Sequence, residues 1–303
     1  IPGVVELAGR SRVLLDALID EERGGWLCRT GLLLVASDPT GLGDLQGLAR
    51  RSGLAHEIME RRDIESVVPP LAGGGAAHGL FLPDAGVVDT HAIVTALARS
   101  ARMAGAQIMT GTAVTRVCAG RGRVEGVELE NGDRVSADVV VIAAGAWAPG
   151  LGASCGAELS LTPLRRHLVQ LEVELSKATP VVWSVGDEVY FRPESGGVLA
   201  SPCDEEPWSP GVPPVAVAAL EGLARKLGRL APSLGRGFVR RAWACLRTSA
   251  PDRVLVAGED PRAVPMAALG LSLGVLIGRS REGHRPLKAI AFKIRKQQGH
   301  GKR

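Results

Sequence analysis

An uninterrupted apolar run from Val139 to Ala144, ending in Gly145-Ala146-Trp147, is the sequence feature that most constrains the fold of this chain. A strand with apolar side chains on both faces must be covered on both faces, as the central strands of α/β proteins are. The glycine at its end lets another backbone or a ligand approach closely. A strand-to-helix turn without any ligand explains the same residues, so the run predicts a buried strand and leaves both interpretations of its end open.

Periodicity elsewhere in the chain predicts alternating helices and strands. Helices are expected over residues 4–19, 42–61, 90–105 and 215–230. Strands are expected over residues 30–36, 107–115, 161–174, 181–185, 188–192, 198–201, 238–247 and 253–258. Asp89 or Thr90 is placed to cap the third helix. The dipeptide Asn131-Gly132 predicts a hairpin over residues 123–135 with a type I′ turn. The fold class predicted is α/β (α+β), with one part built on an antiparallel sheet.

The net charge of +4 comes from the C-terminal end of the chain. Residues 279–303 carry nine Lys or Arg against one acid, whereas the remaining 278 residues carry 27 bases against 31 acids. Apolar residues at helical spacing over 287–294 permit a short basic amphipathic helix there. Because a like-charged end is usually solvated and this one lacks interleaved aromatic residues, we expect a basic tail and no nucleic-acid partner.

Cysteine usage and hydropathy limit the class of protein further. The five cysteines lie far apart without a C-x-x-C pair or a histidine at ligand spacing, which predicts reduced thiols, a cytoplasmic protein and no metal. The longest apolar runs are interrupted by Pro or Gly and are too short for a membrane span of about 20 residues. The chain begins with Ile1 and lacks the pattern of a signal peptide, so we expect it to start inside a longer gene product.

Several short motifs follow one another in a fixed order along the chain. They are Asp84-Ala-Gly-Val-Val-Asp89, Ala104-Gly105-Ala106, the strand over 112–117, Asn131-Gly132-Asp133, Val139 to Trp147, Leu164-Arg165-Arg166-His167, Val189-Tyr190-Phe191-Arg192-Pro193, Leu199 to Glu205, Trp243 to Thr248, and Pro251-Asp252. In this order and spacing the chain resembles the D-amino-acid oxidase family of FAD-dependent oxidoreductases, nearest to the D-arginine dehydrogenase and glycine oxidase type.

That resemblance implies an FAD-binding Rossmann-like domain interleaved with an antiparallel β-sheet domain that binds substrate. The FAD-binding part would comprise residues 1–22, 84–157 and 248–278, the substrate-binding part 23–83 and 158–247, and the basic tail 279–303. The reaction implied is oxidation of a D-amino acid or related amine by hydride transfer to flavin, with an electron acceptor that the sequence does not identify. The cofactor contacts implied are Val114, Ala144, Gly145, Trp147, Gly258 and Gly274.

A planar guanidinium gives two parallel charge-assisted bonds to a carboxylate, so an arginine on a strand is the expected anchor for an amino acid. By resemblance Arg247 is the main anchor, Arg166 is the second, and Tyr190, the only tyrosine, hydrogen-bonds the substrate. Without the resemblance, a surface or ion-paired arginine is the better explanation of Arg247, and a half-buried core residue is the usual explanation of a lone tyrosine. Arg165 points to the strand face opposite Arg166, and either of the two can be the solvent-facing one.

Two departures from the family pattern concern the cofactor. Enzymes of this family open with a G-x-G-x-x-G turn that binds the pyrophosphate, whereas Gly41-Leu42-Gly43 follows Asp38-Pro39-Thr40 rather than a buried strand. The family's last glycine-rich loop corresponds to residues 269–274, where only Gly274 matches. The alternative to an active enzyme is therefore a truncated, inactive fragment without tight FAD binding.

Overall fold

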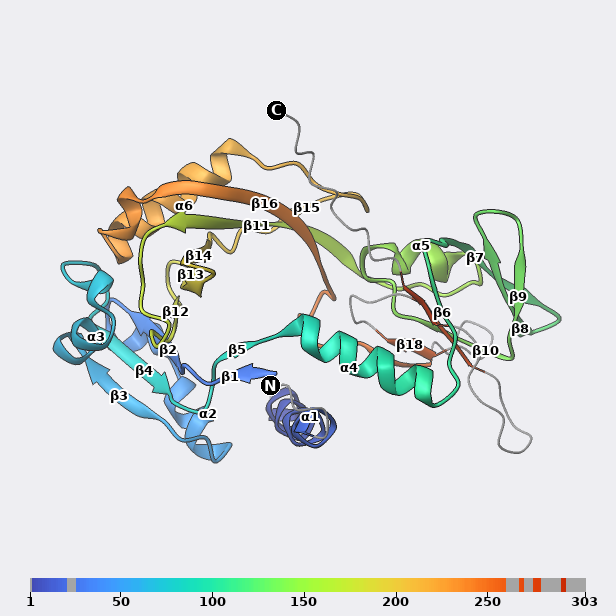
Figure 1. Cartoon of the computed structure of the whole chain (residues 1–303), viewed down its shortest axis with the longest axis horizontal. Helices are drawn as coiled ribbons and strands as arrows, with labels where there is room; N and C mark the ends of the chain where they lie inside the picture. The colour runs from blue at the N-terminus through green and yellow to red at the C-terminus, as the bar shows by residue number, and fades with distance from the viewer. Residues whose placement is uncertain (1, 21–25, 260–266, 270–274, 279–289, 293–303) are drawn as a thin grey trace. The chain divides into compact units, whose positions relative to one another are not determined.

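Two compact units make up the chain in the computed structural model, which describes the backbone of residues 2–20, 26–259, 267–269, 275–278 and 290–292 and the side chains of residues 6–17 and 26–258. Unit 1 comprises Ile1–Ile93, Arg165–Glu206 and Val212–Leu246. Unit 2 comprises Val94–Leu164, Pro207–Gly211 and Arg247–Arg303. Both units combine strands with helices, so the mixed α/β class is confirmed (Figure 1). The assignment of FAD and substrate to parts of the chain stays a prediction, because contacts alone assign neither function.

A nine-stranded sheet is the main element of unit 1. The strands follow the order β15-β11-β14-β13-β12-β2-β4-β3, and β16 pairs with β11. Strands β2 and β12 are parallel, whereas β11-β14, β13-β14, β12-β13, β2-β4 and β3-β4 are antiparallel. The sheet is therefore mixed, with the expected antiparallel pairing predominant. Its strands are β2 Leu32–Ala36, β3 Glu57–Glu60, β4 His78–Leu82, β11 Thr162–Glu172, β12 Val181–Ser184, β13 Val189–Glu194, β14 Gly197–Ser201, β15 Glu206–Pro207 and β16 Phe238–Ser249.

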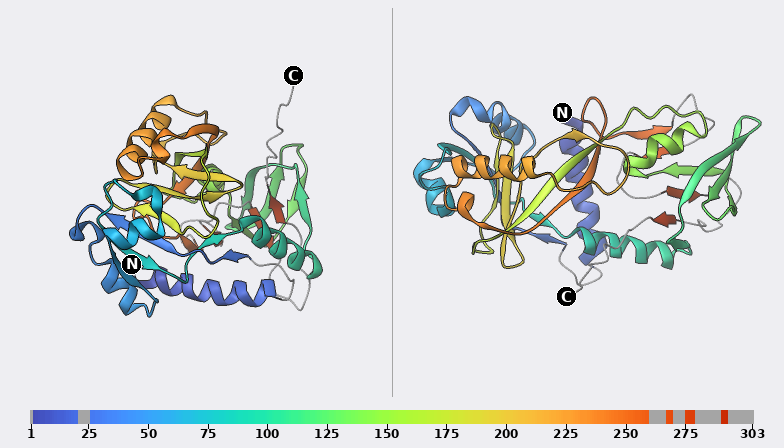
Figure 2. Two further views of the ribbon diagram at one scale, coloured as in Figure 1. Left: turned by 60° about the vertical axis from the view of Figure 1, so that its left-hand side comes forward. Right: turned by 90° about the horizontal axis from the view of Figure 1, so that it is seen from above.

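Helix α6, Val217–Leu230, covers one face of this sheet (Figure 1 and Figure 2). Apolar residues recur along it at helical spacing, which places them on one side of the helix. They pack in one buried cluster with Val169 of β11 and Phe191 of β13, and they are Leu223, Leu227 and Leu230. Because side chains alternate along a strand, Tyr190 and Arg192 lie on the sheet face opposite Phe191.

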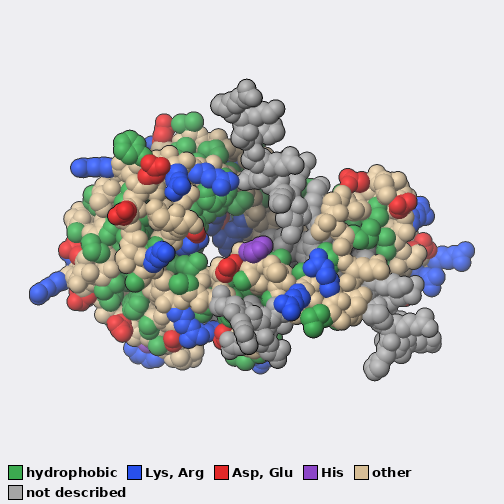
Figure 3. Space-filling view, in the orientation of Figure 1, with side chains coloured by type: hydrophobic (Ala, Val, Ile, Leu, Met, Phe, Trp, Pro, Cys, Tyr) green, Lys and Arg blue, Asp and Glu red, His purple; other side chains and the backbone are tan. Residues whose placement is uncertain are grey.

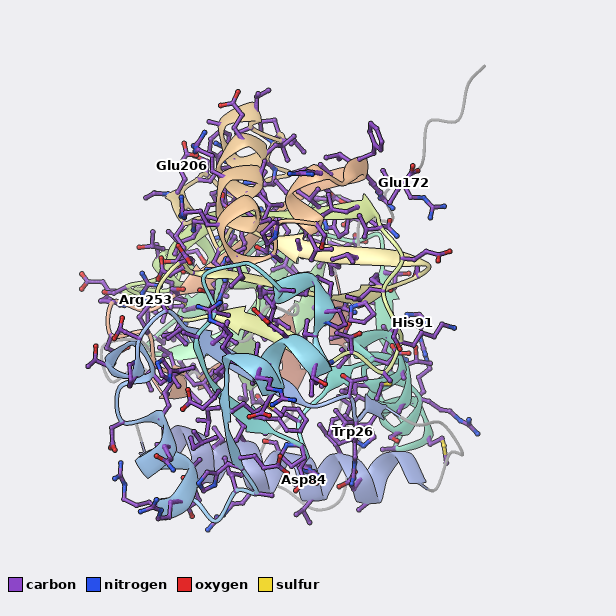
Figure 4. All side chains as sticks on the ribbon, turned by 90° about the vertical axis from the view of Figure 1, so that its left-hand side faces the viewer. Trp26, Asp84, His91, Glu172, Glu206 and Arg253 are labelled. Atoms are coloured by element: carbon purple, nitrogen blue, oxygen red, sulfur yellow. The ribbon has the colours of Figure 1, made fainter. Side chains whose placement is uncertain are left out.

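Trp26 links helix α1, Pro2–Asp20, to the start of helix α4, Thr90–Met103. Its indole N–H donates to Asp16 Oδ1 at 3.1 Å, and its backbone carbonyl accepts the Asp89 N–H at 2.7 Å (Trp26 is labelled in Figure 4). Asp89 Oδ1 accepts the Ala92 N–H at 2.9 Å, which confirms Asp89 as the helix cap. Nearby, two short strands pair antiparallel, and they are β1 Leu27–Cys28 and β5 Val87–Val88.

The single helix predicted over residues 42–61 is wrong. The segment forms a helix, a strand and a second helix, which are α2 Leu45–Arg51, β3 Glu57–Glu60 and α3 Arg61–Val67. Gly53 follows the end of α2 in a left-handed conformation, φ 65°, and its N–H bonds to the Arg50 carbonyl at 3.1 Å. Strand β3 then pairs with β4, a strand that periodicity did not predict. Long-range pairing has overridden local helical spacing here.

Unit 2 is built on a six-stranded sheet with the order β17-β18-β10-β19-β20-β6. Strand β10, Val139–Ile142, lies between β18, which is parallel to it, and β19, which is antiparallel to it. The prediction of a buried strand here is confirmed, since Val140 and Ile142 are fully buried. The other strands of this sheet are β6 Ile108–Thr110, β17 Ala257–Glu259, β18 Ala267–Leu269, β19 Val275–Gly278 and β20 Ile290–Phe292.

A second, three-stranded antiparallel sheet in unit 2 contains the predicted hairpin, and its strands are β7 Val114–Gly120, β8 Arg123–Leu129 and β9 Arg134–Ser136. The type I′ turn is wrong, because only Gly132, φ 86°, has a positive φ, and a type I′ turn also needs one at Asn131. Instead Gly132 N–H bonds to Leu129 O and Leu129 N–H bonds to Asp133 O, both at 2.9 Å. This is a three-residue loop ending in a left-handed glycine.

The remaining described elements are short. They are helix α5 Ala148–Ala153 and the 3₁₀ turns η1 Pro39–Leu42, η2 Pro69–Leu71, η3 Gly145–Trp147 and η4 Leu234–Arg236. Ile290–Phe292 form strand β20 rather than part of an amphipathic helix, because they pair in parallel with β6. The rest of the tail, residues 279–289 and 293–303, lies outside the described residues.

Phe191 is fully buried in the core of unit 1, and Phe238 at the start of β16 is 79% exposed. We expect Phe191→Ala to lower the free energy of unfolding by about 3–5 kcal/mol, because it removes buried surface and leaves a cavity. Phe238→Ala, the matched control, should change it by less than about 0.5 kcal/mol. Urea unfolding measures both, and equal losses for the two variants would contradict this packing.

Candidate functional site

Strand β11 positions the first group of candidate residues, Arg165, Arg166 and His167. Alternation directs Arg165 and His167 to the sheet face that α6 covers, together with Val169 in the core cluster. It directs Arg166 to the opposite face, which also carries Tyr190. All three side chains are largely removed from solvent: the Arg166 side chain is 13% exposed, and those of Arg165 and His167 are less exposed still. The sequence allowed either Arg165 or Arg166 to face solvent, and in the structure neither of them is freely solvated.

Three consecutive acidic residues after β14 pair with these three residues of β11. Glu206 accepts from Arg165 Nη2, Glu205 Oε1 accepts from Arg166 Nη2 at 2.6 Å, and Asp204 Oδ2 bonds to His167 Nδ1 at 2.6 Å. Residue numbers rise along β11 while those of the acidic partners fall, as they do between antiparallel strands. We call these three pairs the carboxylate ladder. Only its middle pair lies on the face of Tyr190, and Glu206, on the other face, lies near α6 in Figure 4.

His167 fixes the segment that carries the acidic residues. Its backbone N–H donates to Asp204 Oδ1 at 3.0 Å, and its ring Nε2 accepts the Ala216 N–H at 2.9 Å. Since Nε2 accepts, the ring proton is on Nδ1, from which it is donated to Asp204. The ring is 1% exposed and lies on the α6 face, so His167 holds the ladder in register and does not face the candidate site.

Arg166 has a buried hydrogen-bond donor without an acceptor among the described residues. Its Nη2 is paired with Glu205, but its Nε is buried and makes no hydrogen bond. A buried donor left unpaired costs about 1–3 kcal/mol, so an acceptor that reaches this nitrogen is stabilised there. A carboxylate oxygen is the acceptor that suits a guanidinium best.

Tyr190 lies on the same face of the sheet. It is directly opposite Trp183 of β12, with the two ring centroids 5.5 Å apart, and opposite Ser201 of β14. Among the described residues no hydrogen bond involves its hydroxyl group. Burial raises the pKa of Tyr190 above its ordinary value, and Arg192 and Arg166 oppose this more weakly. Tyr190 is therefore a neutral donor close to the Arg166 guanidinium.

Lys226 of α6 supports both elements that carry these residues, and sequence reasoning did not identify it. Its ammonium donates to the carbonyls of Glu188 at 3.0 Å, before β13, and of Pro202 at 2.8 Å, after β14. Glu188 and Cys203 both adopt positive φ, 50° and 52°. Backbone in this conformation needs local support, which these two bonds supply. The signal in the sequence was only a basic residue on an amphipathic helix.

Arg247, the expected main anchor, is an exposed residue of β16 and belongs to unit 2. Its role stays a prediction, as do the roles of Arg166 and Tyr190. Of the three anchoring residues, the structure brings Arg166 and Tyr190 onto one face of unit 1.

The candidate cofactor residues lie in unit 2. After β10, Ala144 and Gly145 are partly exposed, Gly145 has φ 52°, and Trp147 is 44% exposed. Small residues at a strand end leave room for a ligand to approach, and the role of these residues toward FAD stays a prediction. Val114 is half-buried at the start of β7, Gly258 is exposed in β17, and Gly274 lies outside the described residues. The printed sequence contains no G-x-G-x-x-G turn for the pyrophosphate.

Other kinds of site find no support in the described part of the chain. No group of three or more His, Cys, Asp or Glu side chains there could hold a metal ion. No described helix is long and apolar enough to cross a membrane. Basic and acidic side chains both occur across the visible surface of each unit in Figure 3.

Comparison with known proteins identifies relatives of this chain. Glycine oxidase of Geobacillus kaustophilus is 28% identical over 285 residues, which cover 90% of this chain and 74% of the relative. The crystal structure of glycine oxidase from that organism superposes with a TM-score of 0.74 at 26% identity, over 88% of this chain and 74% of that one. L-proline dehydrogenase from P. horikoshii shares the fold, with a TM-score of 0.76 at 21% identity over 87% and 72% of the two chains.

A third relative is longer than this chain. The mitochondrial pyruvate dehydrogenase phosphatase regulatory subunit of Mus musculus is 28% identical over 284 residues, and the chain spans 84% of its own length but only 32% of that relative. The family described as FAD dependent oxidoreductase (DAO) matches residues 2–280. Because this match extends over nearly the whole described chain, the protein belongs to the DAO family of FAD-dependent oxidoreductases.

Proposed function

We propose that this chain is the substrate-binding and flavin-contacting part of an enzyme that oxidises a D-amino acid or a related amine. Membership of the DAO family and the similarity to glycine oxidase support an oxidoreductase acting on carbon–nitrogen bonds. FAD, when bound, accepts the hydride, and the protein positions the substrate. The electron acceptor stays unidentified. Five free cysteines agree with the cytoplasmic location proposed from the sequence.

The observation that carries this proposal is the buried, unpaired Nε of Arg166. An amino-acid carboxylate would accept from it and so remove the cost of the unpaired donor. Holding the substrate by its carboxylate limits the orientations of its reacting carbon, which lowers the entropic cost of reaching the reactive geometry. Arg247 stays the main anchor proposed from the family resemblance, with Arg166 as the second.

Tyr190 is proposed to donate a hydrogen bond from its hydroxyl group to the same substrate. Its neighbour Trp183 and the sheet exclude water from part of the ring, which keeps the phenol neutral.

In unit 2, the proposed flavin contacts are Val114, Ala144, Gly145, Trp147, Gly258 and Gly274.

Because Tyr190 is the only tyrosine, its ionisation can be followed alone by absorbance near 295 nm. We expect a midpoint above the ordinary value of 10.0 in the folded chain and a return to that value in denaturant. A raised pKa in the folded state means that its contribution to stability is complete below pH 10 and is lost as the pH rises further. A folded-state midpoint at or below the denatured one would contradict a buried, neutral phenol.

The proposed carboxylate anchor can be tested with two neighbouring arginines of β11. We expect Arg166→Lys to lower kcat/KM for amino-acid oxidation by about a hundredfold or more, because lysine lacks the guanidinium fork. Arg165→Lys, on the opposite face, retains an ion pair with Glu206 and should stay within about threefold of wild type. Flavin reduction by D-alanine and by glycine, with FAD added, measures both.

A third variant, Arg247→Ala, should lower kcat/KM by orders of magnitude while flavin stays bound, since it removes only a substrate contact. Equal kinetics for Arg166→Lys and wild type would remove Arg166 from the site. A purified chain without a flavin absorption band, even with added FAD, would instead support the alternative of an inactive fragment.

A further inference from the structure

We infer that Glu205, paired with Arg166 beside Tyr190, is a specificity-determining residue that disfavours substrates with a second acid group. The inference rests on the proposed function, because it concerns the substrate of the same site. It adds a residue to that site whose effect is to reject a class of substrate.

The geometry gives Glu205 a direct influence on any anion that reaches Arg166. Its Oε1 lies 2.6 Å from Arg166 Nη2, and its side chain is 23% exposed against 13% for Arg166. The pair is neutral as a whole, so a substrate carboxylate that accepts from the free Nε does not meet an uncompensated positive charge. It meets the negative charge of the Glu205 carboxylate, which is bound at Nη2 of the same guanidinium, and at partial burial that repulsion is only weakly screened.

Net charge then separates the substrate classes. An amino acid with a neutral side chain brings an ammonium group together with its carboxylate and has no net charge. A dicarboxylic amino acid brings an additional negative charge to a face where Arg166 is already compensated by Glu205. Arg192, another described arginine on this face, is also compensated, since its Nη2 lies 2.6 Å from Glu194.

Glu205 is held where it is by its neighbours, so the substrate cannot easily displace it. Asp204 is bound through both carboxylate oxygens by His167, and Glu206 is paired with Arg165. Lys226 holds the carbonyl of Pro202 at 2.8 Å, shortly before these residues. With both flanking residues fixed, Glu205 keeps its place opposite Arg166 on the antiparallel ladder.

Binding of two unreactive acids, propionate and succinate, to the whole chain with FAD added tests this inference. In wild type we expect propionate to bind more tightly than succinate. Glu205→Gln keeps the hydrogen-bond acceptor for Arg166 but removes the charge, so it should shift the ratio of the two dissociation constants by about tenfold toward succinate. Glu206→Gln, on the opposite face of β11, should leave that ratio within about twofold. Calorimetry measures the constants, and catalytic selectivity for D-alanine over D-glutamate should shift in parallel.

Wild-type protein alone provides a second measurement that does not depend on the folding of a variant. Monomethyl succinate, which has lost one of the two charges, should bind about tenfold more tightly than succinate. An unchanged propionate-to-succinate ratio in Glu205→Gln, or equal binding of succinate and its monomethyl ester, would overturn the role of Glu205 and leave the carboxylate site intact. If wild type binds neither propionate nor succinate, the proposed carboxylate site itself fails, and this inference fails with it.

Discussion

The carboxylate ladder between β11 and the segment after β14 is the constraint on which the candidate site depends. An arginine held largely out of solvent is costly unless its charge is compensated and its N–H groups are bonded. The ladder compensates Arg165 and Arg166 with Glu206 and Glu205, and it does so on alternate faces of one strand. This arrangement keeps Arg166 charged and rigid on the face of Tyr190 and leaves one of its donors, Nε, without an acceptor.

Much of this fold could be predicted from local pattern. Burial of one or both faces of an element produces a pattern among residues that are close in sequence. Examples are the apolar run at β10, the spacing of Leu223, Leu227 and Leu230 in α6, and the alternation along β11 and β13. The capping role of Asp89 could also be predicted, because a helix cap depends on residues that are adjacent in sequence. The short strands of the nine-stranded sheet in unit 1, which turn residues separate, could also be predicted from local sequence.

What could not be predicted depends on partners distant in the chain. Glu57–Glu60 lies in a segment whose apolar residues recur at helical spacing, and it forms a strand because β4 pairs with it. The hairpin turn differs from expectation because Gly132 has a positive φ and Asn131 does not. Within the site, Arg166 and Tyr190 could be proposed from motif order, but Glu205 and Lys226 could not, because their contacts cross 39 and 24 residues or more of sequence.

The central claim is that the free Nε of Arg166 binds the carboxylate of the substrate. A crystal structure of the chain with FAD and propionate tests this most directly. We expect a propionate oxygen at hydrogen-bond distance from Arg166 Nε, about 2.7–3.2 Å, with Glu205 still bound to Nη2. Propionate bound elsewhere while Nε remains without an acceptor, or Nε bonded to another protein group, would contradict it.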